Sequence, residues 1–113
     1  MSAERGRYEV LLTDGAELDL EALYDYIAEF DDPSNAEYVL ERLLKVVDGL
    51  SHMPERVSYP RELLALGIKA YRQALFKPYR MVYRIGEGSV VVQLIVDGRR
   101  DMQSLLQRRL LGA

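Results

Sequence analysis

The chain has 113 residues and a mass of 13.0 kDa, which is the size of one compact domain, and its 49% hydrophobic and 29% charged content is typical of a globular protein. The absence of cysteine excludes disulfides, thiolate metal sites and cysteine nucleophiles, and a single histidine excludes metal sites built from several histidines. No apolar run approaches the roughly 20 residues of a membrane span, and the N-terminus lacks a secretory signal. We therefore expect one cytoplasmic domain over residues 1–113, with residues 1–7 flexible.

The net charge of −3 conceals two halves of opposite sign. Residues 1–56 carry five basic and fourteen acidic side chains, whereas residues 57–113 carry ten basic and four acidic ones. This division predicts a bipolar molecule whose second half suits anionic partners. The simpler alternative is that the acidic half consists of solvated helix faces and the basic half of ordinary strand edges.

The sequence opens with a predicted strand and a predicted helix. Residues 8–13 (YEVLLT) are rich in residues that favour strands and are followed by a turn signal. Asp14 stands three residues before Glu17, which is the spacing of a capping box, and apolar residues then recur at helical intervals. We therefore expect a helix over residues 16–30 with Asp14 as its cap.

A second helix follows after a very short connection. Asp32 is a favoured capping residue, and Pro33 suits the first helical position because its missing N–H is not needed there. The apolar residues that follow keep the helical period as far as Leu50. Because the connection is short, the two helices should form an antiparallel hairpin.

The second half of the chain changes from a helical to a strand-like pattern. After an irregular stretch with one turn near residues 62–66, alternating residues and turn signals predict three strands and a last helix, over residues 69–76, 79–85, 89–97 and 102–111. The order β-α-α-β-β-β-α predicts an α+β fold. In this fold the helical hairpin packs on one face of a small antiparallel sheet.

The sequence contains none of the common motifs that mark an enzyme active site. The sequence has no glycine-rich phosphate loop, no nucleophile elbow and no cluster of metal-ligand residues, so we expect no cofactor and no metal. The lone His52 follows a predicted helix end, where a surface or capping role is the usual one. The carboxylates of the first helix lie on its solvated face, without the apolar pocket that an acid catalyst requires.

The basic residues of the second half form a more informative pattern. Arg80 and Arg84 share one face of their predicted strand, and Arg99 and Arg100 follow the last strand. A meander should bring Arg100 towards Arg80, with Arg72 on the neighbouring strand. Clustered guanidinium groups bind phosphate or carboxylate groups well. The alternative is that these arginines pair with the acidic helices of the same chain.

Taken in order, these segments resemble the RelE/ParE superfamily of toxins from bacterial type II toxin–antitoxin modules. The resemblance covers residues 8–111 and rests on YEVLLT, AELDLEALYDYI, PSNAEYVLERL, MPERVSYP, FKPYRMVYRI and VVVQLIVDGRRDMQSLLQRRL. It implies a small antiparallel sheet with an N-terminal helical hairpin, in agreement with the element order above.

The superfamily has two functional branches, which the resemblance allows us to compare residue by residue. RelE-like toxins cleave messenger RNA in the ribosome with lysines, arginines and, in some members, a C-terminal tyrosine, whereas ParE-like toxins bind DNA gyrase. Arg80 and Arg100 match the two arginines of the ribonuclease set. Its lysine positions fall on Tyr71 and Gln73, and its tyrosine position falls on Leu106. The resemblance therefore implies the ParE-like branch.

The first hypothesis is a ParE-like toxin that inhibits DNA gyrase and is neutralised by an antitoxin whose disordered C-terminal segment folds across it. The resemblance also implies a toxin–antitoxin hetero-oligomer. We expect the segment 99–111 to contact the target and the helical hairpin to form part of the antitoxin groove. The expected partner-binding residues are Arg72, Arg80, Arg84, Arg99, Arg100, Gln103, Gln107 and Arg108.

Two alternatives remain at this stage. The chain could be a RelE-like ribonuclease with a rearranged site made of Arg80, Arg100 and Tyr83. It could also be a non-toxic relic that only binds an antitoxin-like repressor. Loss of toxicity in an Arg80→Ala variant would favour the first alternative, and harmless overproduction of the chain would favour the second.

Overall fold

The computed structural model describes residues 7–112, so the flexibility expected for residues 1–7 lies, except at Arg7, outside the described residues. These residues form an α+β fold in the order β1 (Glu9–Leu12), α1 (Asp14–Phe30), α2 (Pro33–Gly49), the 3₁₀ helix η2 (Pro54–Arg56), α3 (Arg61–Leu64), β2 (Arg72–Phe76), β3 (Tyr79–Ile85), β4 (Ser89–Asp97) and α4 (Met102–Leu110). Within residues 7–112, no helix has both the length and the apolar content that a bilayer crossing requires.

The four strands form one mixed sheet in the order β1-β4-β3-β2. The expected antiparallel meander of β2, β3 and β4 is confirmed. The α+β fold class is confirmed, but the sheet is mixed and not antiparallel throughout, because β1 runs parallel to β4, with Val10 opposite Val90. A strand of four residues carries no information about the direction of a partner that lies about eighty residues further along the chain.

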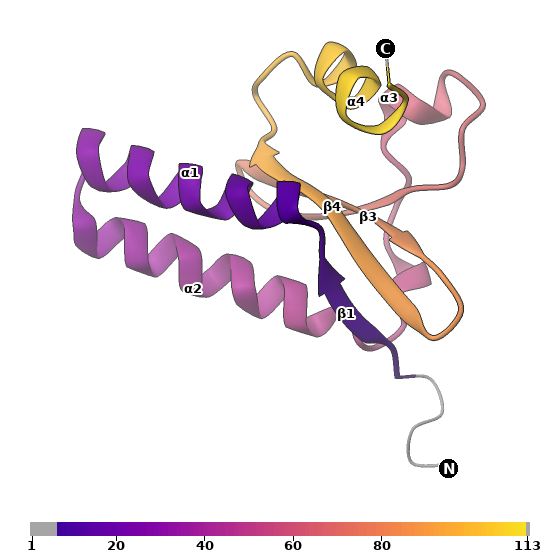
Figure 1. Cartoon of the computed structure of the whole chain (residues 1–113), viewed down its shortest axis with the longest axis horizontal. Helices are drawn as coiled ribbons and strands as arrows, with labels where there is room; N and C mark the ends of the chain where they lie inside the picture. The colour runs from indigo at the N-terminus through magenta and orange to yellow at the C-terminus, as the bar shows by residue number, and fades with distance from the viewer. Residues whose placement is uncertain (1–6, 113) are drawn as a thin grey trace.

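The sheet lies between two helical layers (Figure 1). The α1–α2 hairpin covers one face, where a first core includes Leu43, Val47, Met81 and Val92. Helices α3 and α4 cover the other face, where a second core includes Leu63, Val82, Leu94 and Leu106. The hairpin was expected on one face, and the structure adds the second layer.

A β-bulge in β4 determines which side chains face each layer. Val82 pairs with Leu94, but the next residue, Tyr83, pairs with Val92, so Gln93 is the extra residue. Before the bulge, Val92 faces the hairpin, and after it Leu94 faces α4. At this bulge the backbone carbonyl of Gln93 accepts hydrogen bonds from the side chains of Thr13 and Arg109.

The two hairpin helices begin at capped positions. Asp32 accepts a hydrogen bond from the Ser34 amide at 3.2 Å, as expected for a cap. The cap of α1 is Thr13, whose Oγ1 accepts from the Ala16 amide at 3.0 Å, and the prediction of Asp14 as the cap is wrong. Asp14 is instead the first helical residue, where a carboxylate is favoured by the positive end of the helix dipole.

The structure corrects one further prediction and confirms another. The strand expected over residues 69–76 begins only at Arg72. His52 is exposed, as expected for a surface residue, and forms an isolated backbone bridge with Arg7.

Candidate functional site

The guanidinium group of Arg80 forms hydrogen bonds with two side chains of the same chain. Its guanidinium donates to both carboxylate oxygens of Glu62, at 2.8 and 2.9 Å, and to the side-chain carbonyl of Gln73, at 2.6 and 2.9 Å. The side chains of Arg80 and Glu62 are only 11% and 16% exposed. The hydrogen bonds from Arg80 hold the pKa of Glu62 below its usual value. The internal pairing considered for this arginine is therefore formed, with a carboxylate of α3 and not with the hairpin.

Arg72 also points inward. Its Nη1 donates to the carbonyls of Glu55 and Val57 at 2.8 and 3.0 Å, and its Nη2 donates to the hydroxyl of Tyr59 at 3.0 Å. The guanidinium lies 4.4 Å from the centre of the Tyr59 ring. Arg72 thus fastens the irregular segment before α3 to β2, although no carboxylate among the described residues forms an ion pair with it.

Arg99 and Arg100 lie at the exposed end of β4. Arg99 is 76% exposed and pairs with Asp97, an arrangement that contributes little stability in water. Both arginines line a cavity of about 510 Å³ between α1 and the end of β4. Arg80 lines a different cavity, together with Arg99 and Gly98, and the approach of Arg100 to Arg80 stays a prediction.

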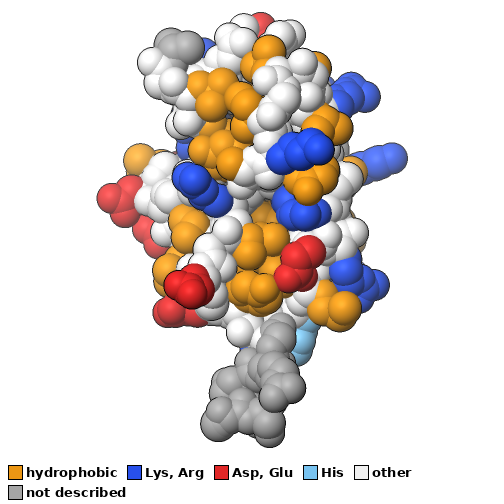
Figure 2. Space-filling model, turned by 90° about the vertical axis from the view of Figure 1, so that its right-hand side faces the viewer, with side chains coloured by type: hydrophobic (Ala, Val, Ile, Leu, Met, Phe, Trp, Pro, Cys, Tyr) orange, Lys and Arg blue, Asp and Glu red, His pale blue; other side chains and the backbone are white. Residues whose placement is uncertain are grey.

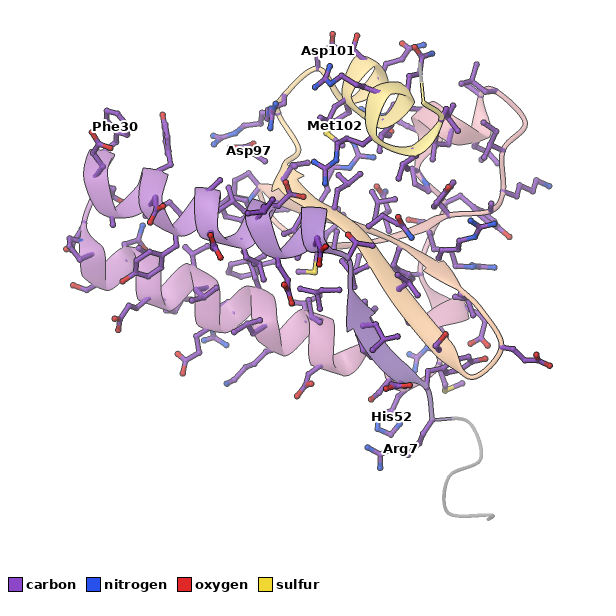
Figure 3. All side chains as sticks on the ribbon, in the orientation of Figure 1. Arg7, Phe30, His52, Asp97, Asp101 and Met102 are labelled. Atoms are coloured by element: carbon purple, nitrogen blue, oxygen red, sulfur yellow. The ribbon has the colours of Figure 1, made fainter. Side chains whose placement is uncertain are left out.

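The first cavity continues into an apolar stripe along α1. Ala22 and Tyr26 line the cavity, and the stripe extends to Phe30, whose ring centre is 4.8 Å from that of Tyr26. Tyr26 and Phe30 are 63% and 67% exposed, which is unusual for large aromatic side chains. Figure 3 shows Phe30 at the far tip of the hairpin and Asp97 at the end of β4. We call this surface the α1–β4 groove, formed by Ala22, Tyr26, Phe30, Ile95, Arg99 and Arg100.

Tyr83 cannot join Arg80 in a ribonuclease site. Its side chain is completely buried in the core beneath the hairpin, and its hydroxyl donates to the Pro54 carbonyl at 2.7 Å. Burial raises its pKa to about 12. The alternative set of Arg80, Arg100 and Tyr83 is therefore not brought together, because one member is paired and another is inside the core.

Helix α4 presents a mixed surface beside α3. Asp101 caps the helix through the Ser104 amide, and Leu105 and Leu106 are buried against the sheet. Gln103 and Arg108 are exposed, and Gln107 is half-buried. The end of α4 lies near α3 (Figure 1), and these elements also leave leucines exposed by 41–48%. We call this the α3–α4 surface, formed by Leu64, Leu66, Leu111, Gln103, Gln107 and Arg108.

Sequence reasoning missed an ion pair that joins α1, β4 and α4, and the expectation that the carboxylates of the first helix are solvated is wrong at Asp19, whose side chain is only 15% exposed. Arg109 donates to both oxygens of Asp19 at 3.1 and 3.0 Å and to the Gln93 carbonyl at 3.2 Å. Asp19 also accepts from the Ile95 amide at 3.0 Å, beyond the point where β1 ends. The only signal in the sequence was that Asp19 stands four residues before Leu23, on the inner side of α1.

Arg84 remains on the surface. It is exposed, and its guanidinium lies 5.6 Å from the ring centre of Tyr71, a residue that is itself 9% exposed. Of the eight expected partner-binding residues, Arg72 and Arg80 turn inward and the remaining six are accessible, Gln107 only in part.

Comparison with known proteins identifies the fold and the family. One chain from each of two toxin–antitoxin structures has a similar fold: the chromosomal ParDE system of P. aeruginosa (TM-score 0.70, 18% identity, covering 81% of this chain and 97% of that chain) and the RelBE2 complex of Mycobacterium tuberculosis (TM-score 0.59, 24% identity, covering 82% and 93%). No curated protein sequence matches the chain. Residues 10–102 match the family model of the ParE toxin of the type II toxin–antitoxin system parDE. Because this match spans most of the sequence, the chain belongs to the ParE family of toxins of type II toxin–antitoxin systems.

Proposed function

We propose that the chain inhibits DNA gyrase in the cytoplasm by protein–protein contact and that a cognate antitoxin neutralises it. The observation that favours gyrase inhibition over RNA cleavage is the pairing of Arg80 with side chains of the same chain. Its charge is neutralised by Glu62, and Gln73, at a position where the ribonuclease branch has a lysine, accepts two of its hydrogen bonds. The sheet face thus presents an internal ion pair at the place where RNA cleavage requires free cations.

The chemistry of RNA cleavage supports the same choice. Attack by a 2′-hydroxyl needs a group that takes up a proton and cations that stabilise the pentavalent phosphorane. Leu106 occupies the position of the C-terminal tyrosine and is completely buried. Tyr83, with a pKa of about 12, stays protonated at neutral pH and has no access to RNA.

The α1–β4 groove is the proposed site of the antitoxin. Its apolar wall would take apolar side chains of a segment that folds on binding, and carboxylates of that segment would reach Arg99 and Arg100. The exposed aromatic side chains at the wall, Tyr26 and Phe30, are the kind of anchor that dominates binding energy in protein interfaces. The resulting assembly is a toxin–antitoxin hetero-oligomer.

A substitution in the groove tests this assignment. Ala22→Glu places a carboxylate against the apolar wall and should weaken antitoxin binding by at least about 10-fold, since burying an unpaired charge is costly. Leu44→Glu is the matched control, because Leu44 is an exposed leucine of α2 that lies outside the groove. Calorimetric titration with the antitoxin measures both. Equal affinities for the two variants would place the antitoxin elsewhere.

The α3–α4 surface is the proposed contact with gyrase. Exposed leucines beside Arg108 combine an apolar centre with a polar rim, as protein interfaces commonly do. We expect Gln103→Glu combined with Arg108→Glu to weaken binding of immobilised toxin to gyrase at least 10-fold. Lys45→Glu, at an exposed residue of α2, is the control and should bind gyrase with an affinity within twofold of that of the unaltered chain. If the unaltered chain fails to bind gyrase, the proposed function is wrong. If the double variant and Lys45→Glu bind gyrase equally well, the assignment of the contact to the α3–α4 surface is wrong.

A further inference from the structure

Most cations of the second half have no carboxylate partner. Of the ten basic side chains after residue 56, three form ion pairs: Arg80 with Glu62, Arg99 with Asp97, and Arg109 with Asp19. Seven form no ion pair with any other residue of the described part of the chain: Arg61, Lys69, Arg72, Lys77, Arg84, Arg100 and Arg108. The same half holds only four carboxylates, of which two are used in these pairs and Asp101 caps α4.

Four of the seven gather in two clusters along β3. Lys69 and Arg84 line a hollow of about 330 Å³, and Arg61 and Lys77 line another of about 420 Å³. Arg72 also lines the first hollow, but its guanidinium already donates to the Glu55 and Val57 carbonyls and to the Tyr59 hydroxyl. Arg84 lies near the end of β3 and Lys77 just before its start, so the clusters are separated by roughly the length of the strand, about 20 Å. Figure 2 shows several Lys and Arg side chains on the side of the molecule that lies to the right in Figure 1. We call Arg61, Lys69, Lys77 and Arg84 the basic face.

We propose that the basic face binds the phosphate backbone of duplex DNA. A duplex carries one phosphate about every 3.4 Å along each strand, so a length of about 20 Å brings phosphates to both clusters at once. A protein partner would instead have to place carboxylates at two separate points. The inference rests on the proposed function for the source of the DNA, which is the duplex that gyrase holds.

The fold explains how a chain of net charge −3 can approach DNA. The acidic residues are concentrated in the α1–α2 hairpin, which covers the opposite face of the sheet from α3 and α4 (Figure 1). Arg61 is in α3, and Arg84 lies over Tyr71, a member of the second core on the α4 side. Contact through the basic face therefore turns the acidic hairpin away from the phosphates.

Salt dependence is the first part of the test. Fluorescence anisotropy of a labelled 20-base-pair duplex is titrated with the full chain in the absence of gyrase. If about four phosphates are neutralised, log affinity falls against log salt with a slope of about −3.6. Raising salt from 50 to 200 mM should then weaken binding about 100-fold. Failure to bind at 50 mM salt, or a slope near zero, overturns the inference.

Matched variants are the second part. Lys69→Glu with Arg84→Glu should weaken DNA binding at least 10-fold, whereas Arg42→Glu with Lys45→Glu, which changes the net charge equally on the hairpin, should change it less than twofold. Lys69→Gln with Arg84→Gln repeats the test with a smaller change, and melting curves report whether each variant is folded. Equal losses of DNA affinity in the two double variants that replace cations by glutamate would show that overall charge governs binding and would overturn the inference.

Competition and gyrase binding separate the remaining possibilities. If polyglutamate displaces the labelled duplex as well as unlabelled DNA does, the basic face serves an acidic protein and the inference is wrong. Gyrase binding is measured separately with the immobilised chain. DNA binding without gyrase binding refutes the proposed function alone, and gyrase binding without DNA binding refutes this inference alone.

Discussion

Arg80→Ala is expected to lower the free energy of unfolding by about 3 kcal/mol, because it leaves the Glu62 carboxylate without its partner at a site that is only 16% exposed. For a chain of this size the melting temperature should fall by about 10 °C. Arg84→Ala is the matched control, since Arg84 is an exposed arginine of the same strand and should cost less than about 1 kcal/mol. Thermal unfolding followed by circular dichroism measures both.

The pH dependence of this difference gives a second readout. Because the folded-state pKa of Glu62 is lowered, the stabilisation from the pair is fully present above the unfolded pKa, about 4.3. It is lost as pH falls through the lower folded pKa. The gap in melting temperature between the unaltered chain and Arg80→Ala should therefore narrow from pH 7 to pH 3. A gap that stays constant would contradict the ion-pair explanation.

The proposed function adds a further expectation for Arg80→Ala. At a temperature where the variant is folded, its inhibition of gyrase should remain within about threefold of the unaltered chain, since Arg80 contributes structure and not chemistry. Adding Glu62→Gln to Arg80→Ala removes the unpaired carboxylate and should recover part of the lost stability. No recovery in the double variant would mean that Glu62 is not the residue left unsatisfied.

Asp19→Ala has the second large expected effect, a loss of about 2–3 kcal/mol. It removes both bonds from Arg109 and leaves the amide of Ile95, a completely buried residue, without an acceptor. Amide hydrogen exchange should accelerate at Ile95 and throughout α4, because the tie from α4 to α1 and β4 is gone. Asp25→Ala, an exposed aspartate of the same helix, should leave exchange in α4 unchanged.

A conservative replacement distinguishes the two interactions of Asp19, the ion pair with Arg109 and the hydrogen bond from the Ile95 amide. Asp19→Asn keeps an oxygen that can accept from Ile95 but loses the charge-assisted pair with Arg109. We expect a loss about half as large as that of the alanine variant. If the amides of α4 are equally protected from hydrogen exchange in the unaltered chain, Asp19→Ala and Asp19→Asn, the role assigned to the pair of Asp19 and Arg109 is contradicted.

Local patterns in the sequence predicted the elements because the periods of β3, α1 and α2 are regular and β4 is a long apolar run bounded by turn signals. They could not predict the parallel pairing of β1, which depends on a distant partner, or the bulge at Gln93, since VVVQLIVD is apolar on both faces. The cap of α1 was misplaced by one residue because Thr13 and Asp14 are both good capping residues.

The sequence predicted which charged residues belong to the candidate site, but it could not predict which of them pair with one another. The charge division drew attention to the arginines of the second half, of which Arg100 and Arg108 are exposed in the structure, and their binding role stays a prediction. The pairing of Arg80 with Glu62 joins residues 18 positions apart on different elements, and sequence spacing carries no signal for it. The same is true of Asp19 and Arg109, which are 90 positions apart.

The most direct test of the proposed contact mechanism compares two reactions with the same purified toxin. One contains gyrase, supercoiled plasmid and ATP and is scored for linear plasmid from trapped double-strand cleavage. The other contains ribosomes programmed with messenger RNA and is scored for cut RNA. We predict linear plasmid in the first reaction and intact RNA in the second. Intact plasmid together with cut RNA would contradict the mechanism and assign the chain to the ribonuclease branch.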